Sequence, residues 1–261
     1  MSNILSELKT KALTIENKTI MNFLKEHNGF RNSKLHLFIG STGVGKSTLT
    51  RTVLLDFLGA NTDKNAGLFL SEETHEDFLT EFSFTELPLE KIEKLKVVSE
   101  SSMPSSMKIL EKLDILIQEA ELNIMFIDNI TTVSEYESAR PGQQNEIAKG
   151  IKALAVKYKI PIVVIAHSGG TVIQYAKALM DSNNIRGGKG IVNLAEFVYL
   201  IQSITINDQR KTILRISKSR GQNVKNQTHQ LFYYPTARIF GKSESVDFSK
   251  LKELFKQMDT L

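Results

Sequence analysis

The segment GSTGVGKST at residues 40–48 has the residue types and spacing that hold a chain of phosphates. It fits the pattern G-x-x-x-x-G-K-[ST] through Gly40, Gly45, Lys46 and Ser47. Glycines permit a tight turn whose N–H groups point at phosphate oxygens, and a helix start adds partial positive charge. We expect Lys46 to reach the β- and γ-phosphates of ATP and the Ser47 hydroxyl to ligate Mg²⁺. The predicted nucleotide contacts are Gly40, Ser41, Thr42, Gly43, Val44, Gly45, Lys46, Ser47 and Thr48.

Asp128 follows the apolar run IMFI at 124–127. A carboxylate at the end of a buried strand is costly to desolvate unless it has a partner. In an α/β sheet the carboxyl ends of the strands lie beside the phosphate loop. We therefore expect Asp128 to hold Mg²⁺ through water or Ser47, the alternative being a solvated aspartate.

Two adjacent carboxylates, Glu72 and Glu73, follow the apolar run GLFL at 67–70. A water that attacks the γ-phosphate needs a base or an orienting group, and either glutamate could supply it. Their side chains point in different directions, so the residues alone leave the choice open. A solvated pair of loop residues is the alternative.

Three further residues have the right chemistry in less specific surroundings. His167 follows the apolar run IVVIA at 162–166 and could sense the γ-phosphate, although the residues alone favour a structural histidine. Lys218 and Arg220 lie on a late strand or its end, on one side of it, because side chains alternate along a strand.

The elements that must position these residues follow an alternating pattern. Continuous apolar runs at 35–39, 67–70, 95–98, 124–127 and 162–166 suit strands buried on both faces of a parallel sheet. Helical patterns lie between them at 47–58, 105–120 and 143–158. The sequence therefore predicts an α/β core. Later short runs at 197–201, 212–216 and 231–234 predict antiparallel strands added at one edge of the sheet.

The ends of the chain have helical patterns. We divide the chain into a helical arm at 1–33, an ATPase domain at 34–241 and a C-terminal amphipathic helix at 242–261. The chain has no signal-peptide pattern and no apolar run long enough for a membrane, so we expect a cytoplasmic protein. The absence of cysteine excludes disulfides, zinc ribbons and thiol nucleophiles. A net charge of +4 permits nucleic-acid binding, although a lysine-rich genome explains it equally well.

The string LSEETHEDF at 70–78 resembles the segment after the second strand in RecA-like ATPases, including the KaiC/RadA group and DnaB-type replicative helicases. In those proteins the first glutamate is catalytic, which implies that Glu72 is the base and Glu73 a helper. The position of His167 is usually glutamine or histidine there, with a sensor role.

The resemblance to DnaB-type helicases runs from Lys34 to about Ile239, with similar segments at 145–167 and 185–201. It implies that 130–142 and 168–190 are loops facing a central channel. Such loops follow a DNA backbone through phosphate contacts, and an ordinary solvated charge is the alternative for each basic residue. The predicted DNA contacts are Arg140, Lys177, Arg186 and Lys189.

Lys218 and Arg220 resemble the K-x-R pair that RecA-like rings insert into a neighbouring subunit's ATP site. The resemblance as a whole implies a Mg²⁺-dependent ATPase that forms a homo-oligomeric, hexameric ring and acts as a helicase on single-stranded DNA in replication. The alternatives are a recombination mediator or loader, and a regulatory assembly of the KaiC sort.

Only 39 residues precede Gly40, so the chain looks like the small stand-alone hexameric helicases of plasmids and phages. We expect replication or loader proteins as partners in a bacterial, phage or plasmid setting. The arm at 3–28 could pack on the next subunit in place of the large N-terminal domain of DnaB.

Overall fold

The computed structural model describes residues 21–25, 29–82, 89–169, 179–206, 209–220, 226–247 and 249. Within these ranges one nine-stranded sheet has the order β3-β2-β4-β5-β1-β6-β7-β8-β9. The strands are β1 Leu35–Gly40, β2 Ala66–Leu70, β3 Leu95–Ser99, β4 Ile124–Asp128, β5 Ile162–His167, β6 Phe197–Ile206, β7 Gln209–Ser219, β8 Thr228–Tyr234 and β9 Ile239–Val246.

The first six strands are parallel, as expected for continuous apolar runs with helical connections. All residues of β1, β2, β4 and β5 are buried, because helices cover both faces of the sheet. Because these strands run in the same direction, their carboxyl ends lie side by side at one end of the sheet. The last residues of β1, β2, β4 and β5 there are Gly40, Leu70, Asp128 and His167. This end of the sheet carries the candidate site.

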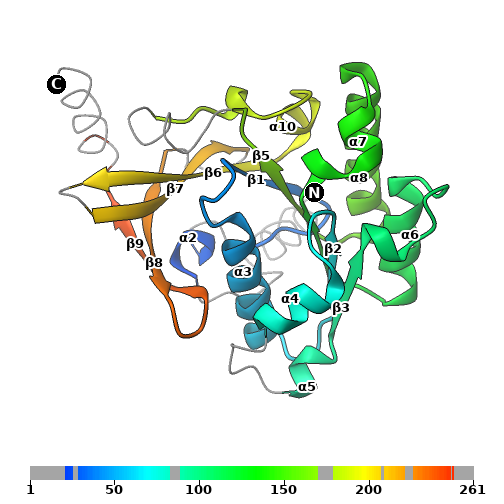
Figure 1. Ribbon diagram of the computed structural model, residues 1–261, viewed down its shortest axis with the longest axis horizontal. Coiled ribbons are helices and arrows are strands. Elements are labelled where there is room, and N and C mark those ends of the chain that lie inside the picture. Colours follow the sequence, from blue (N-terminus) through cyan, green and yellow to red (C-terminus); the bar gives the residue numbers. More distant parts are fainter. Residues whose placement is uncertain are drawn as a thin grey trace, which may run out of the picture.

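Helices pack on the sheet in two layers (Figure 1). One face is covered by α6 Ile109–Glu119, α7 Ser134–Ser138, α8 Pro141–Tyr158 and α10 Gly190–Leu194. The other is covered by α2 Asn22–Lys25, α3 Lys46–Ala60 and α4 His75–Phe82, with α5 Leu89–Ile92 nearby in the chain. Successive side chains of β1 point to opposite faces of the sheet, so Leu37 packs in the core under the first layer of helices and Phe38 in the core under the second. Short 3-10 helices are η1 Glu100–Ser102, η2 Ile130–Thr132 and η3 Ser182–Asn184.

The antiparallel extension expected at one edge consists of β7, β8 and β9. The register of β7 on β6 pairs Ile206 with Gln209 and Phe197 with Ser219. β6 passes Gly40 at Ile201 and continues beyond it. The start of β7 therefore lies at the carboxyl ends of the parallel strands, where the phosphate loop is. The end of β7 lies at their amino ends.

The predicted C-terminal helix is wrong at its start. Residues 242–246 belong to β9, which pairs with β8 from Tyr234–Ile239 to Thr228–Val246. The segment has no apolar run that would mark a strand. It is a strand because the turn at 235–238 brings it back beside β8, and because the Phe240 side chain is buried. Residues 248 and 250–261 lie outside the described residues.

The described part of the N-terminal arm also differs from the prediction. Met21, Leu24 and Phe30 are buried in the core cluster that contains α3 and β9. These residues therefore belong to the ATPase domain of their own chain, so the predicted boundary after residue 33 is wrong for 21–25 and 29–33, and Met21 and Leu24 pack within their own chain. Residues 1–20 and 26–28 lie outside the described ranges.

The predicted channel loop at 130–142 is mostly helical, because η2, α7 and the start of α8 occupy it. Among the described residues, no helix has the length and apolar character needed to cross a membrane.

Candidate nucleotide site

The phosphate loop joins the end of β1 to the start of α3. Gly43 and Gly45 have positive φ angles of 77° and 99°, a conformation that side chains with a Cβ rarely adopt. Gly45 is the residue before the first turn of α3, so the N–H groups of that turn face the loop. The loop thus has the backbone geometry that a phosphate chain requires.

Lys46 lies under this loop and is 7% exposed. Its Nζ donates a hydrogen bond to the Ser41 carbonyl at 2.9 Å. Burial lowers the pKa of Lys46, while the nearby carboxylates of Asp128 and Glu72 act in the opposite direction. The ammonium is held in place by its own loop and is available to the phosphates of a bound nucleotide.

Asp128 ends β4 beside this lysine and is 8% exposed. Burial raises the pKa of Asp128, and the Thr50 hydroxyl, Lys46 and the Ser47 hydroxyl oppose that rise. Hydroxyl and carboxylate oxygens suit Mg²⁺, which binds few protein ligands and keeps phosphate and water oxygens in its shell. No group of three or more His, Cys, Asp or Glu side chains that could hold a metal ion occurs in the described part of the chain.

Glu72 contacts the end of β5. Its Oε1 lies 2.7 Å from His167 Nε2 and accepts a hydrogen bond from Asn129 Nδ2 at 3.2 Å. The hydrogen bond with His167 lowers the pKa of Glu72, against the effect of partial burial, and Thr132 and Lys46 add to the lowering. The side chain is 47% exposed, so Glu72 is an ionised carboxylate that water reaches.

Glu73 is half-buried. Burial raises the pKa of Glu73, Asp128 raises it further, and Arg51 opposes both. Its buried Oε2 has no hydrogen-bond partner among the described residues. The two glutamates therefore differ in environment, and Glu72 is the one that contacts His167.

His167 joins three parts of the site. Its Nδ1 lies 3.4 Å from the Thr42 Oγ1 of the phosphate loop, and its Nε2 contacts Glu72. Its carbonyl accepts a hydrogen bond from the Arg186 N–H at 2.8 Å. A residue that the sequence alone treats as structural thus lies between the phosphate loop, the candidate base and the segment that carries the predicted DNA contacts.

Lys218 and Arg220 point the same way, as predicted, and both donate to the Asn193 carbonyl at the end of α10. They lie at the amino ends of the parallel strands, whereas the phosphate loop lies at the carboxyl ends. Arg220 Nη1 is 3.7 Å from Glu196, whose N–H bonds to Leu35 at the start of β1. The six residues of β1 separate the two ends by roughly 20 Å at about 3.3 Å per residue. Within one chain this pair does not reach the phosphate loop.

The described parts of the two predicted DNA segments lie together. Gln144 donates to the Tyr136 carbonyl at 2.9 Å and accepts from the Gly188 N–H at 2.6 Å. Arg186 pairs with Glu137 at 3.1 Å, and both side chains are more than half exposed. Arg140 and Lys189 are exposed on the same segments, whereas Lys177 lies outside the described residues.

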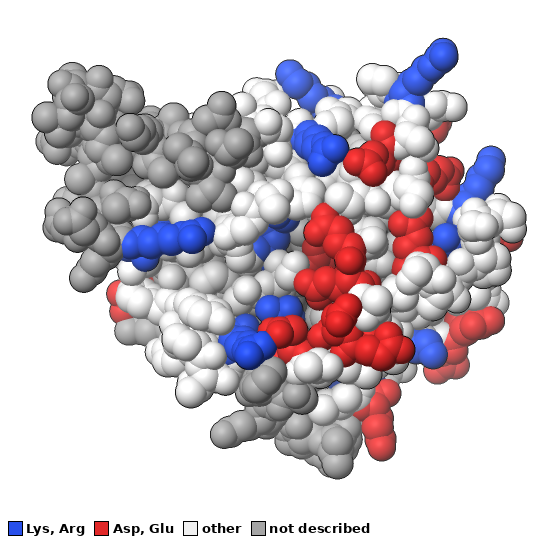
Figure 2. Space-filling model, in the orientation of Figure 1, with Lys and Arg blue, Asp and Glu red and all other residues white. Residues whose placement is uncertain are grey.

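Charge is unevenly distributed around the site. Figure 2 shows acidic side chains gathered across the middle of one face, where Figure 1 places the end of β2 and α4. Lysine and arginine side chains stand around this acidic region. Such an acidic surface repels polyanions.

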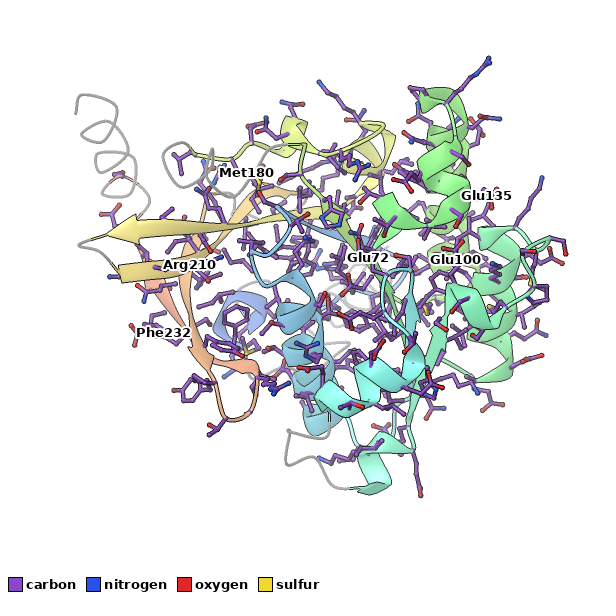
Figure 3. The ribbon with its side chains drawn as sticks, viewed as in Figure 1. Glu72, Glu100, Glu135, Met180, Arg210 and Phe232 are labelled. Carbon is purple, nitrogen blue, oxygen red and sulfur yellow. The ribbon has the colours of Figure 1, made fainter. Side chains whose placement is uncertain are left out.

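Arg210 is a site residue that the sequence analysis missed. It lies at the start of β7 (Figure 3), where its Nη2 donates to the Gly43 carbonyl at 3.0 Å and its Nε to Ser203 at 3.1 Å. Only the register of β7 on β6 brings it to the phosphate loop, and no local motif marks it. Asn129 was also missed, although its place directly after Asp128 was a usable signal.

The comparisons with known proteins agree with this geometry. A family model described as AAA domain matches residues 24–171, which is more than half of the chain. A search of curated proteins found no match.

Proposed function

The chain belongs to the AAA-domain family and is a P-loop ATPase, and we propose that it works as a ring that couples Mg²⁺-dependent ATP hydrolysis to movement on single-stranded DNA. The parts of this proposal rest on different residues. Hydrolysis rests on the phosphate loop and Glu72, ring formation on Lys218 and Arg220, and coupling to DNA on His167.

For hydrolysis, Glu72 acts as the base. Its carboxylate is ionised, half-exposed and oriented by His167 and Asn129. A water between Glu72 and the γ-phosphate gives up a proton to this carboxylate as its oxygen attacks the γ-phosphorus; the bond from that phosphorus to the bridging oxygen breaks, and ADP leaves with the bridging electrons. Lys46 and the backbone N–H groups of the loop hold the phosphate oxygens. Mg²⁺, held by Ser47 and Asp128, would neutralise charge on the β- and γ-phosphates.

For the ring, Lys218 and Arg220 act on a neighbouring subunit. Hydrolysis leaves negative charge on the transferred phosphoryl group, and a cation close to it stabilises the transition state. Arg220 is exposed and Lys218 is partly buried, and both lie away from their own phosphate loop. Their placement suits an arrangement in which each subunit presents this end of the sheet to the next subunit's nucleotide, in a hexamer or another closed ring.

One observation supports the link between ATP and DNA most directly. The His167 ring contacts Glu72, and the His167 carbonyl accepts the N–H of Arg186. A change at the γ-phosphate that moves Glu72 or Thr42 therefore reaches Arg186 through one residue. The exposed Arg186–Glu137 pair is worth about 1 kcal/mol or less, so a DNA phosphate competes for this arginine at small cost.

The test is ATP turnover with and without single-stranded DNA, followed by strand displacement on a forked duplex, with Lys46→Ala as the inactive control. We expect DNA to stimulate turnover and the forked duplex to be unwound. Stimulation without unwinding would identify a recombination mediator or loader instead. Turnover that ignores DNA would contradict the DNA part of the proposal and favour a regulatory ATPase.

A further inference from the structure

Arg210 is an exposed cation that the fold holds against the phosphate loop (Figure 3). Its Nη2 donates to the Gly43 carbonyl at 3.0 Å, and its Nε donates to the Ser203 hydroxyl at 3.1 Å. Ser203 is only 3% exposed, so the second bond is anchored inside β6. Nε and Nη2 belong to one planar guanidinium, so the two bonds fix its plane as well as its position. The contact with Gly43 is therefore directed, unlike that of an ordinary surface arginine.

The part of the loop that Arg210 holds is otherwise open. A Cβ placed on Gly43 would find no heavy atom within 4 Å in the described part of the chain. Further along the loop, the Phe240 ring lies against Gly45 and supports that side. Gly43 has a positive φ angle of 77° and no side chain, so its backbone rotates easily. Arg210 supplies a support at this open glycine.

The direction of the Gly43 carbonyl decides where the next N–H points. The peptide bond between Gly43 and Val44 is trans, so its C=O and N–H point in opposite directions. Because Arg210 holds the carbonyl, the Val44 N–H turns the other way, where it donates to the Ser41 carbonyl at 3.3 Å. Lys46 Nζ donates to the same carbonyl at 2.9 Å. The Val44 N–H and the ammonium expected to bind phosphate thus meet on one side of the loop.

A flip of this peptide would reverse its polarity. The carbonyl oxygen would then face the phosphate side, where its partial negative charge repels the oxygens of a diphosphate, and one N–H of the loop would be lost. Arg210 opposes the flip, because turning the Gly43 carbonyl inward breaks a hydrogen bond from a charged donor. Such bonds are stronger than those between neutral groups.

We propose that Arg210 is a positioning residue of the phosphate loop, which holds the Gly43–Val44 peptide in the orientation that binds the phosphates of ATP and ADP. It acts through the loop backbone rather than through the base or the ribose. The proposal rests on the phosphate loop as the nucleotide site and is independent of the ring and of DNA. Its test is therefore a binding measurement, whose result a failure of the ring or DNA parts of the proposed function leaves unchanged.

Calorimetric titrations with ADP and with inorganic pyrophosphate, each with Mg²⁺, test this role. Both ligands carry the diphosphate that the loop holds, and pyrophosphate lacks the base and the ribose. Arg210→Met keeps most of the side-chain length and removes every N–H donor. We expect it to weaken both ligands by the same factor, about tenfold or more, as for the loss of a hydrogen bond from a charged group. Arg210→Lys keeps a cationic donor but has no second arm for Ser203, so its affinities should lie between those of wild type and Arg210→Met.

Lys211→Met is the matched control. It removes one positive charge at the next residue of β7, whose side chain points to the other face of the sheet, and should bind both ligands as wild type does. Arg210 is exposed, so Arg210→Met should keep the wild-type Tm. Wild-type affinity of Arg210→Met for both ligands would overturn the proposal. A loss confined to ADP would also overturn it, by placing Arg210 at the base or ribose, and so would an equal loss in Lys211→Met, which would reduce the effect to net charge.

Discussion

Glu72 Oε1 lies 2.7 Å from His167 Nε2, although 95 residues separate the two in the chain. Strands β2 and β5 bring them together, since both finish at the end of the sheet that carries the phosphate loop. The contact orients one of two adjacent glutamates, keeps it ionised and ties it to Thr42 and Arg186 through a single ring and its backbone. Glu72 is the candidate base and His167 is the residue that orients it, so substitutions of the two residues should have different effects.

Glu72→Gln should lower single-turnover ATP hydrolysis by about 10²–10⁴-fold, the usual contribution of a positioned general base. ATP binding should survive, because the phosphate loop is untouched. Glu73→Gln is the matched control and should have a milder effect, since Glu73 has no contact with His167. A larger loss for Glu73→Gln would reverse the assignment of the base.

His167→Ala should move the acid limb of ATP turnover to higher pH. In the wild-type protein the hydrogen bond from His167 lowers the pKa of Glu72, so the carboxylate stays ionised as the pH falls toward that lowered value. Without the hydrogen bond the pKa rises and the base is protonated at a higher pH. The measurement is the pH dependence of single-turnover hydrolysis, with His75→Ala as the control. An unmoved acid limb would show that His167 does not act on Glu72.

Lys218 should give the ATPase an alkaline limb. Burial, with the adjacent charge of Arg220, lowers the pKa of Lys218 to about 8. A lysine is cationic below its pKa, so a role that needs the charge is lost as the pH rises through this value. We expect kcat/KM to fall above about pH 8, and Lys218→Arg to remove that fall because arginine stays charged. The same fall in Lys218→Arg would assign it to another group.

Neutralising Arg186 and Lys189 together should weaken binding of single-stranded DNA and flatten its salt dependence, because fewer counterions are released. Each lost phosphate contact reduces the slope of log affinity against log salt by about 0.7 for a single strand. Lys149→Ala with Lys157→Ala on α8 is a control of equal charge. If both double variants have the wild-type slope, Arg186 and Lys189 are not in the DNA path.

The sequence predicts those parts of the site that are formed by residues close together in the chain. The phosphate loop needs only a strand, its glycines and a helix, and Asp128 needs only the end of a buried strand. The choice between Glu72 and Glu73 depends on which one meets His167, and the spacing within LSEET does not contain that information. The resemblance to RecA-like ATPases selected Glu72, and the contact with His167 now gives a physical reason for that choice.

Features that depend on strand pairing were beyond the sequence. Arg210 reaches Gly43 because β7 turns back on β6 at a particular residue, and shifting that register by one would send the side chain to the other face. The strand β9 has no apolar run and exists through its hairpin with β8. The arm residues Met21 and Leu24 looked like a separate helix because their partners, α3 and β9, are distant in the chain.

The most direct test of the account mixes two inactive variants. Lys46→Ala lacks the lysine of the phosphate loop, and Arg220→Ala lacks the cation at the opposite end of the sheet. If each site is shared between subunits, both variants alone should be inactive, while Arg220→Ala still binds ATP. Mixed assemblies, prepared from dissociated protein and verified by mass, should regain part of the ATPase activity, because some interfaces join an intact phosphate loop to an intact Arg220. Mixed rings that stay inactive, together with full activity of Arg220→Ala alone, would contradict the shared site and the ring that depends on it.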